Sequence, residues 1–563
     1  MTLKTDVLIV GAGPVGLITA LLLERLDVDF LVVERRAGLH KAPQAHVISS
    51  RSMEICRLAG IDDGLIRAAG PNPMDTRNIR WVDKLVGKDL GVFSMVRDAD
   101  QVRRMLTQSP TPTTNLSQDR FEQILFEHLR SRQAVRFEHA WVGCEPIEVG
   151  FASQIHAGSG DALEVVSRYV IGADGAGSGV RAAMGAGMVG PDNIQSFVNV
   201  HFSANMRQHL EGREGLLYWV MDGACDGVFI AHNIDSNWIF MKTAEPGDSL
   251  DPIDEDKYAA LLRTAVGVDA DLKINSMNAW RMTAQISDAY AKGGMFLVGD
   301  AAHRFPPTGG IGMNTGFQDA HNLVWKIGMV LAGYDDTLLE TYEPERKPIA
   351  QTNSSQSLSN AMRMSEVAKL LDVSGDGRIS RADLDAVFAS IDRQADVQAA
   401  IDAQAPHFDM SGLDLGLCYS SKAVVSDGLP PQPTDPVSNY EPSTTPGARL
   451  PHAVLTRAGE RISTLDLVVY DGLLVLAATD ADSQLDTAVA ELVRDGYPMQ
   501  LVRVGDGQPV VPADEQFAAL FPIGQVLLVR PDGHISARLE ASSAAAQLAA
   551  TVRKLLPRTI AKQ

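Results

Sequence analysis

Apolar and polar residues follow two distinct patterns near the start of the chain. Residues 6–10 (DVLIV) form a short apolar run bounded by glycine, which predicts a buried strand, and residues 14–26 carry apolar side chains at helical spacing. A second apolar run, residues 30–33, ends at Glu34. Because parallel strands need a crossover connection, this order predicts a βαβ unit.

Further segments predict layers around this unit. Residues 165–171 and 295–298 are apolar runs that predict additional buried strands, and short alternating pieces between 195 and 290 predict a mainly antiparallel second sheet. Helical periodicity predicts helices over 118–129 and 319–331.

Other stretches carry weaker or different patterns. Prolines between residues 60 and 116 predict loops and short strands, and residues 355–425 alternate helix and loop. Residues 428–447 are rich in Pro, Ser and Thr, which predicts a linker, and alternating strands and helices beyond them predict a small α/β domain.

Length, charge and cysteine spacing narrow the class of protein. The chain has 563 residues, which predicts about three domains, and its formal net charge of -20 disfavours a nucleic-acid partner. No signal-peptide pattern and no apolar stretch of about 18 residues occurs, so we expect no membrane span. The cysteines are far apart and form no C-x-x-C pair, which predicts reduced thiols in a cytoplasmic protein: Cys56, Cys144, Cys225 and Cys418.

The first candidate for chemistry is the stretch Gly11-Ala12-Gly13-Pro14-Val15-Gly16, between the predicted strand and helix. Glycines at this spacing permit a tight turn, close approach of a pyrophosphate and close packing of helix on strand. Glu34 can accept hydrogen bonds from ribose hydroxyls and disfavours a 2′-phosphate, so the site suits the ADP half of FAD or NAD. The alternative is a glycine turn without a ligand.

Two further motifs follow predicted strands. One is Asp174-Gly175-Ala176-Gly177-Ser178-Gly179-Val180-Arg181, and the other begins at Gly299-Asp300 and continues through Pro306 to Asn314. A carboxylate at a strand end can hold the ribityl hydroxyls of a flavin. The glycines of residues 309–312 can offer bare N–H groups to its ring, beside a helix expected to begin near Gly316.

With all three motifs, the chain resembles the single-component aromatic hydroxylases of the p-hydroxybenzoate hydroxylase type, and most of all their phenol hydroxylase and chlorophenol monooxygenase branch. The resemblance rests on GAGPVG (11–16), DGAGSGVR (174–181) and GDAAHRFPPTGGIGMNTGFQDAHNLVWK (299–326), and it extends over essentially the whole chain. It implies an α/β fold with a Rossmann-like FAD-binding domain, an antiparallel-sheet substrate domain and a C-terminal thioredoxin-like domain without redox cysteines.

The expected domain boundaries follow from the motifs and the linker. We assign 1–75, 105–185 and 285–365 to the FAD-binding domain, 76–104 and 186–284 to the substrate-binding domain, 366–427 to a helical segment, 428–447 to a linker, and 448–563 to the thioredoxin-like domain. The last domain would serve packing or oligomerisation, for example in a homodimer.

The resemblance also implies a set of cofactor contacts. Glycines 11, 13 and 16 with Glu34 and Arg35 would hold the AMP half of FAD, and Asp300 would bind ribityl and pyrophosphate groups. Asp174 belongs to a motif implicated in both FAD and NAD(P)H contact. The full set of expected cofactor-binding residues is Gly11, Gly13, Pro14, Val15, Gly16, Glu34, Arg35, Gln44, Gln118, Asp174, Asp300, Pro307, Gly310, Gly312, Met313 and Asn314.

The implied reaction has two halves. NAD(P)H, as a transient co-substrate, reduces the flavin, and the reduced flavin reacts with O2 to give a C4a-hydroperoxide that hydroxylates a small phenolic substrate. The choice between NADH and NADPH stays open. A base beside the substrate hydroxyl would help, because a phenolate is the better nucleophile.

Few residues are candidates for that base or for the substrate pocket. His46 stands where phenol hydroxylases have an acidic residue, and an imidazole titrates near neutrality; the alternative is a structural histidine. Arg304 is a further candidate near the substrate, whereas His303 is expected to be structural. Tyr218 and Trp219 lie on a predicted strand and would line an aromatic pocket or belong to the core.

Residues 372–383 resemble an EF-hand loop. The candidate Ca²⁺ ligands are Asp372, Ser374, Asp376, Arg378 and Asp383, with Gly377 at the sharp turn. Ser at the third position, Asp at the twelfth and the lack of a second hand count against it. The alternative is a capped turn between two helices.

Two other functions stay open at this point. A flavin enzyme of this kind could instead oxidise or epoxidise a polycyclic natural product, whereas a halogenase is disfavoured because no W-x-W-x-I-P stretch occurs. An ion-binding assembly protein on a flavin scaffold would rest on residues 372–383, but the intact glycines and Asp300 argue against it.

Overall fold

The N-terminal apolar run forms the middle of a mostly parallel sheet in the computed structural model, which describes residues 2–375, 377–428, 436–478, 483–521 and 524–558. β1 (Thr2–Val10) pairs in parallel with β2 (Phe30–Val33) and with β10 (Ala162–Gly172). α1 (Pro14–Arg25) connects β1 to β2, which confirms the βαβ unit. The sheet continues with β7 (Val135–Arg136), β8 (His139–Pro146), β9 (Phe151–Ala157), β18 (Ala291–Lys292) and β19 (Met295–Leu297).

The second sheet has seven strands and is antiparallel except for one pair, β13 with β4. Its order is β16 (Lys273–Met282), β12 (Gln195–Ser203), β15 (Asn237–Thr243), β14 (Gly227–Asn233), β13 (Leu217–Val220), β4 (Asn78–Val82) and β5 (Asp89–Ser94). α7 (Glu255–Val266) packs Tyr258 and Leu262 against one face. The other face is therefore available to line a site.

Two helices lie in the region where only loops and short strands were expected. They are α3 (Asp63–Ala69) and α4 (Ala99–Gln108), and each begins at an aspartate whose side chain accepts a backbone N–H of the first turn. Neither helix contains a proline, and the prolines that led us to expect loops lie beyond the helix ends, at 71 and 73 after α3 and at 110 and 112 after α4. Such caps satisfy N–H groups that a helix start leaves unpaired.

α8 (Ile311–Leu331) begins five residues before the expected start at Gly316. A Cβ on Gly316 would lie 2.6 Å from Cγ2 of Val15 and 2.9 Å from Cα of Gly299. Glycine is a poor helix former, but here it permits close packing of the helix on the first βα turn. The early start places Gly312, Met313 and Asn314 in the first helical turn.

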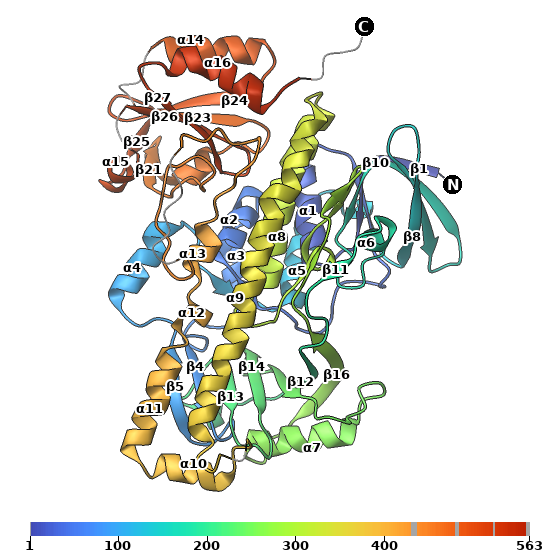
Figure 1. The fold of residues 1–563 in the computed structure, drawn as a ribbon, viewed down its shortest axis with the longest axis vertical. Helices are drawn as coiled ribbons and strands as arrows, with labels where there is room; N and C mark the ends of the chain where they lie inside the picture. Colours follow the sequence, from blue (N-terminus) through green and yellow to red (C-terminus); the bar gives the residue numbers. More distant parts are fainter. Residues whose placement is uncertain (1, 376, 429–435, 479–482, 522–523, 559–563) are drawn as a thin grey trace.

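α9 (Tyr342–Leu371) is a 30-residue helix that spans most of the length of the molecule (Figure 1). It leads to four shorter helices: α10 (Arg381–Phe388), α11 (Ile391–Asp402), α12 (Ala405–Phe408) and α13 (Ser411–Leu415). α11 packs on β5, and Gln398 exchanges hydrogen bonds with the backbone of Val92 at 3.0 and 3.1 Å. The helical segment thus covers one edge of the second sheet.

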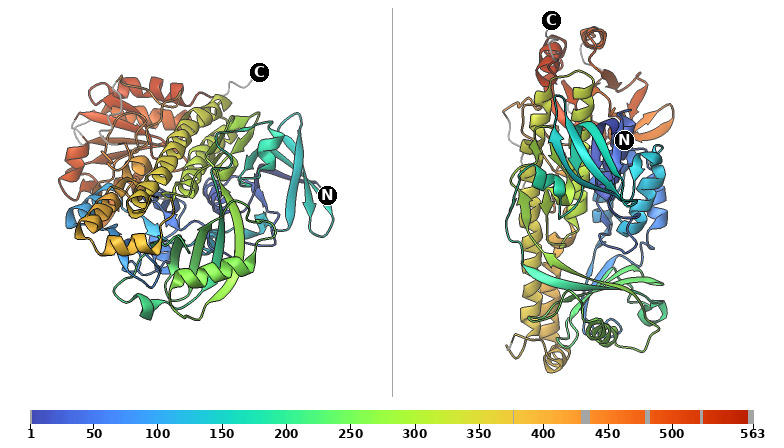
Figure 2. Two further views of the ribbon diagram at one scale, coloured as in Figure 1. Left: turned by 60° about the horizontal axis from the view of Figure 1, so that its bottom comes forward. Right: turned by 90° about the vertical axis from the view of Figure 1, so that its right-hand side faces the viewer.

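The C-terminal domain is a separate mixed sheet with helices, as predicted. Its strand order is β22 (Glu460–Ser463), β21 (Val454–Arg457), β25 (Val510–Pro512), β24 (Met499–Val504), β23 (Leu473–Ala478), β26 (Gln525–Val529) and β27 (Ile535–Glu540). Its helices are α14 (Gln484–Arg494), α15 (Gln516–Leu520) and α16 (Ala544–Leu555). Figure 2 shows this domain and the second sheet at opposite ends of the molecule.

Shorter elements complete the chain. They include β3 (Val47–Ile48), α2 (Ser50–Leu58), β6 (Thr114–Asn115), α5 (Gln118–His128), α6 (Gly179–Ala183), β11 (Met188–Val189), β17 (Gln285–Ser287), the 3-10 helix η3 (Gly299–Ala301) and β20 (His303–Arg304). All four cysteines are free thiols. In the described part of the chain, no helix is long and apolar enough to cross a bilayer.

Candidate active site

One continuous cavity of about 1750 Å³ runs from the first βα turn to the open face of the second sheet. It is lined by all three glycine-containing motifs, by the first turn of α8 and by strands β12 to β16. Pockets for a single drug-sized ligand span roughly 300–1,000 Å³. The volume therefore suffices for a dinucleotide and a second molecule.

The glycines of the first motif have the geometry that a dinucleotide turn requires. Gly11 has a φ of +106°, and a Cβ there would lie 2.3 Å from the carbonyl oxygen of Ala173. A Cβ on Gly16 would lie 2.0 Å from the Gly11 carbonyl oxygen, so both positions exclude a side chain. A Cβ on Gly13 would meet no atom within 4 Å, which leaves this backbone open to a ligand on the cavity side.

Glu34 lies at the end of β2 and lines the cavity, although it is only 6% exposed. Its carboxylate accepts hydrogen bonds from the Ala12 N–H at 2.9 Å and from Nε of Arg36 at 3.0 Å. Burial acts to raise the pKa of Glu34, but the hydrogen bonds from Arg36 and Ala12 outweigh it and lower the pKa. Arg36 was not singled out in the sequence, whereas Arg35, which was, lies exposed at the cavity wall.

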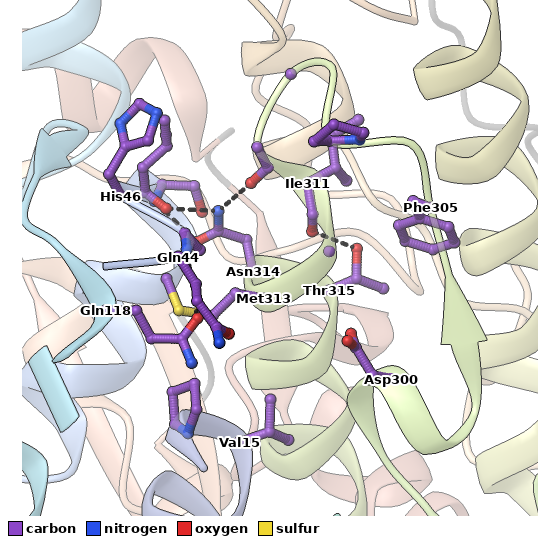
Figure 3. Close-up of a pocket in the computed structure, with 18 of the residues that line it drawn as sticks. Val15, Gln44, His46, Gln118, Asp300, Phe305, Ile311, Met313, Asn314 and Thr315 are labelled. Carbon is purple, nitrogen blue, oxygen red and sulfur yellow. Dashed lines mark hydrogen bonds between the residues drawn. The ribbon is translucent and has the colours of Figure 1, made fainter. Parts of the chain in front are cut away.

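Asp300 follows β19, a parallel strand of the first sheet, and faces the same cavity from η3 (Figure 3). Among the described residues, none donates a hydrogen bond to its carboxylate. The Asp300 side chain is exposed to the cavity, but the protein around it displaces water and raises the pKa of Asp300, while the charges of His303 and Arg304 act in the opposite direction. An acceptor held without a partner at a cavity wall is suited to the hydroxyls of a sugar chain.

The first turn of α8 forms the wall between Asp300 and Gln118 (Figure 3). Gly310 caps the helix with a φ of +64°, and a Cβ on Gly312 would meet nothing within 4 Å. Asn314 accepts a hydrogen bond from the Ser49 N–H at 2.9 Å, which ties the helix to the segment after His46. Free N–H groups and the positive end of the helix dipole therefore face the cavity.

The other expected cofactor residues also line this cavity, with differing local roles. Gln118 accepts from the Ala45 N–H at 3.4 Å and donates to Glu122 at 2.9 Å, and Gln44 is exposed to the cavity (Figure 3). Asp174 accepts the Gly179 N–H at the start of α6 at 2.7 Å, while its other carboxylate oxygen is buried without a partner in the described chain. The remaining members Pro14, Val15, Pro307 and Met313 are wall residues.

His46 lies where the dinucleotide part of the cavity meets the second sheet. Its Nδ1 is 3.1 Å from Oδ1 of Asn115, and its ring stands edge-on to that of His232 with centroids 5.5 Å apart. Burial lowers the pKa of His46, although the hydrogen bond to Asn115 acts to raise it. Burial likewise holds the pKa of His232 well below its usual range, and the charges of His46 and His201 act in the same direction.

His232 and His201 were missed in the sequence. Both ring nitrogens of His232 lack a hydrogen-bond partner within the described ranges, whereas Nε2 of His201 is 2.9 Å from Oδ1 of Asn237. Both residues lie on strands of the second sheet, β14 and β12. Strand alternation gave no reason to separate them from core residues.

The two residues expected to line an aromatic pocket point to opposite faces of β13. Trp219 lines the cavity and lies 6.5 Å from the ring of Trp81. Tyr218 is fully buried on the α7 side, where its hydroxyl donates to the carbonyl oxygen of Arg213 at 2.9 Å. The pocket prediction is therefore wrong for Tyr218, because successive side chains of a strand alternate between its faces.

Arg304 lines the cavity but is already engaged by protein groups. Its guanidinium donates to the Ala176 carbonyl oxygen and to Gln285 at 3.3 Å. His303 is fully buried, and its Nε2 lies 2.8 Å from Asp319. These contacts agree with a structural part for His303 and hold Arg304 beside the second glycine motif.

The part of the cavity over the second sheet has two chemically different sides. Polar side chains on β12 and β16 line it, among them Asn199, His201 and Asn278, beside Trp280, while Trp219 of β13 and Phe93 of β5 contribute aromatic surface toward the other edge of the same sheet. Phe408 of α12 lies 5.0 Å from the Phe93 ring and extends this aromatic side. Such a surface suits a flat molecule with polar groups along one edge.

The EF-hand-like loop forms capping hydrogen bonds in the described residues. Asp383 accepts from the backbone N–H groups of Ser374 and Ser380, each at 2.8 Å, and Asp372 accepts from that of Gly377 at 2.9 Å. Arg378 donates to Gly223, and Asp376 lies outside the described residues. No group of three or more His, Cys, Asp or Glu side chains in the described chain is placed to hold a metal ion. The geometry favours the capped turn.

Comparison with known proteins agrees with this site along the whole chain. A family model described as FAD binding domain matches residues 4–357, and one described as aromatic-ring hydroxylase, C-terminal, matches residues 443–558. The chain is 30% identical to 2,4-dichlorophenol 6-monooxygenase of Delftia acidovorans over 554 residues, 95% of this chain and 94% of that enzyme. It is also 30% identical to aklavinone 12-hydroxylase RdmE of Streptomyces purpurascens, with 99% of each chain covered.

A solved structure shares the complete architecture. The flavin-dependent monooxygenase PieE, in complex with FAD and substrate, superposes with a TM-score of 0.91 at 29% identity, covering 98% of this chain and 99% of that one. Fold and cavity thus define an FAD-dependent monooxygenase that consumes NAD(P)H. The chain belongs to the FAD-dependent aromatic hydroxylases, the family that its motifs resemble.

Proposed function

We propose that this aromatic hydroxylase acts on a phenol with more than one fused ring, and that His46 accepts the phenol proton. The observation that carries the proposal is the cavity itself: about 1750 Å³, with an aromatic side and a polar side over the second sheet. FAD held in this cavity would supply the redox chemistry, which is acceptance of a hydride from NAD(P)H and activation of O2. The residues of the chain must then bind, orient and deprotonate the substrate.

His46 has the local chemistry of a base. Because Nδ1 is directed at the Asn115 carbonyl oxygen, Nδ1 carries the proton and the lone pair of Nε2 is free to accept one. The lowered pKa keeps the imidazole neutral at neutral pH. A phenol placed against His46 would lose its O–H proton to Nε2, which raises the electron density of the ring.

The cofactor assignments are part of the same proposal. In this proposal the first glycine turn and Glu34 would hold the adenosine and pyrophosphate end, Asp300 the ribityl hydroxyls, and the first turn of α8 the flavin ring, all of which line the cavity. Gln44, Gln118 and Asp174 line the same cavity and would make further contacts to the cofactor. Room at Gly13 and Gly312 and the unpartnered carboxylate of Asp300 support this placement.

The test is a panel of phenols of increasing size. Purified FAD-loaded enzyme is supplied with phenol, 2,4-dichlorophenol, 1-naphthol and a hydroxylated anthraquinone, and the stimulation of NADH and NADPH oxidation is measured together with product mass. We expect the fused-ring phenols to give the stronger stimulation and a product heavier by one oxygen atom. Stimulation by single-ring phenols alone would contradict the proposed substrate size.

Product analysis also separates the alternative, oxidation or epoxidation of a polycyclic compound, by the position of the new oxygen. The cytoplasmic location and the homodimer stay predictions. The four free thiols are compatible with the first.

A further inference from the structure

A buried loop of the C-terminal domain, which carries Arg530 and Asp532, contacts α9 and α8, and the first turn of α8 lines the cavity. Arg530 donates to both carboxylate oxygens of Glu345 on α9, at 2.7 and 2.9 Å. Asp532 accepts from Nε1 of Trp325 on α8 at 3.2 Å, and its carbonyl oxygen accepts from Arg51 of α2 at 2.6 Å. Arg530 and Asp532 are each 1% exposed.

These contacts belong to a balanced set of buried charges. Three cations and three anions take part, and each side chain is 0% or 1% exposed: Lys326, Arg346, Arg530, Asp319, Glu345 and Asp532. Burying charge costs free energy even when the ions are paired, and apolar replacements often stabilise a protein. Stability alone therefore does not explain the cluster, which leaves a requirement for fixed geometry as the second explanation.

The cluster reaches both elements that face the flavin position. Arg346 follows Glu345 directly on α9, and it donates to Asp319 at 2.8 Å and to the Thr315 carbonyl oxygen, in the first turns of α8, at 3.2 Å. Asp319 in turn accepts from the Gly299 N–H at 3.2 Å and lies 2.8 Å from Nε2 of His303. Gly299 and His303 flank the segment that carries Asp300.

We propose that the C-terminal domain sets the affinity for FAD, with Arg530 and Asp532 as positioning residues that hold the Asp300 segment and the first turn of α8 in place. The C-terminal domain would thus help to retain FAD, a role that does not require a redox-active cysteine pair. The inference depends on FAD binding alone and not on the proposed substrate or on His46.

The test compares two contacts between the C-terminal domain and the FAD-binding region, the buried cluster around Arg530 and Asp532 and the more exposed Arg57–Asp466 bridge. Asp532→Asn removes one buried charge at nearly constant shape, and Arg530→Lys keeps the charge but loses the two-pronged contact to Glu345. The matched control is Arg57→Gln, which breaks the more exposed bridge from α2 to Asp466 of the C-terminal domain, at 2.8 Å. FAD is removed from each full-length protein, and the dissociation constant is measured by titration with FAD and the quenching of its fluorescence.

We expect Asp532→Asn and Arg530→Lys each to raise the FAD dissociation constant at least tenfold, while Arg57→Gln changes it less than twofold. The melting temperature of the FAD-free proteins and the visible circular dichroism of bound flavin are measured in parallel. A purely structural role would lower the melting temperature but leave affinity and flavin dichroism as in the parent, and that outcome would overturn the proposal. If Asp532→Asn does not fold, Arg530→Lys decides by the same two criteria.

Discussion

At the scale of single residues, His46 offers the most direct test of the proposed chemistry. Replacing it by Asn removes the free imidazole lone pair while keeping a polar side chain. Because a positioned general base contributes roughly 10²–10⁴-fold, we expect product formation with the best phenol to fall by about that range. His407→Asn is the control, since His407 also lines the cavity but stacks on Phe408 with ring centroids 4.4 Å apart.

The pH dependence of His46 has a defined sign. Its pKa is lowered mainly by burial, so the neutral, proton-accepting form persists below the usual value of 6.5 as the pH falls. We expect kcat/KM of the parent to decline only below pH 6.5, and this acid limb to be missing in His46→Asn. An acid limb that stays in place in the variant would show that another group titrates.

At the scale of elements, the two faces of strand β13 have different roles: Trp219 lines the cavity, and Tyr218 packs in the core. Trp219→Ala removes aromatic surface from the cavity, which is worth about 1–3 kcal/mol, so we expect KM for a fused-ring phenol to rise roughly tenfold or more. Tyr218→Phe removes only the hydroxyl bond to Arg213, worth about 1 kcal/mol of stability. The KM of Tyr218→Phe should match that of the parent. A KM change in Tyr218→Phe as large as that in Trp219→Ala would contradict the assignment of Trp219 to the cavity face and Tyr218 to the core face of β13.

The turn before α10 gives a second prediction at this scale. Asp383 forms a capping box with Ser380, and its side-chain and backbone hydrogen bonds to Ser380 lower the pKa of Asp383. A lowered pKa means that the stabilisation is present above the ordinary value of 3.8 and is lost as the pH falls through the folded value. We therefore expect Asp383→Asn to lower the melting temperature at pH 7 and to lower it by less at pH 3.

Ca²⁺ distinguishes the capped turn from an ion-binding loop at residues 372–383. If residues 372–383 bound the ion, millimolar Ca²⁺ would raise the melting temperature of the parent and not that of Asp383→Asn. The observed hydrogen bonds occupy the carboxylates of Asp372 and Asp383 with backbone N–H groups. We expect Ca²⁺ to change neither melting temperature.

Sequence patterns predicted those elements whose periodicity and boundary residues agree. The βαβ unit, the antiparallel sheet and the small C-terminal domain belong to this group. α8 differs because the glycine that suggested its start is required by packing against Val15, a contact about which local sequence carries no information. α4 was missed since its cap at Asp98 is followed by only ten helical residues, which end shortly before Pro110.

At the scale of the whole molecule, the motifs located the cavity but not its full lining. The glycine stretches, Glu34 and Asp300 lie together as expected, because the ends of parallel strands meet at one sheet edge. His232 and His201 come from strands whose register with His46 depends on tertiary contacts. The buried ion pairs were equally invisible, since Arg530 and Glu345 are 185 positions apart in the chain.

A second buried cluster of charges joins the C-terminal domain to the FAD-binding region. It allows a prediction of how strongly this contact stabilises the protein. Glu54 of α2 accepts from Nε of Arg449 at 2.9 Å, from Arg51 at 2.9 Å and from Ser109 at 2.6 Å. Arg449→Met would leave Glu54 buried with only one cation. Because breaking a buried pair costs about 3–5 kcal/mol, we expect the melting temperature to fall by several degrees.

The size and the pH dependence of the loss of melting temperature in Arg449→Met distinguish the buried Arg449–Glu54 pair from an ion pair at the surface. Arg57→Gln breaks an exposed bridge worth about 0–1 kcal/mol and should leave the melting temperature nearly unchanged. Burial acts to raise the pKa of Glu54, but Arg449 and Arg51 outweigh it and lower the pKa, so the pair stabilises the protein above the ordinary value of 4.5 and loses this effect in acid. The difference between Arg449→Met and the parent should therefore narrow as the pH falls below 4.5. A gap that is constant between pH 7 and pH 3.5 would mean that Arg449 acts through packing and not through its charge on Glu54.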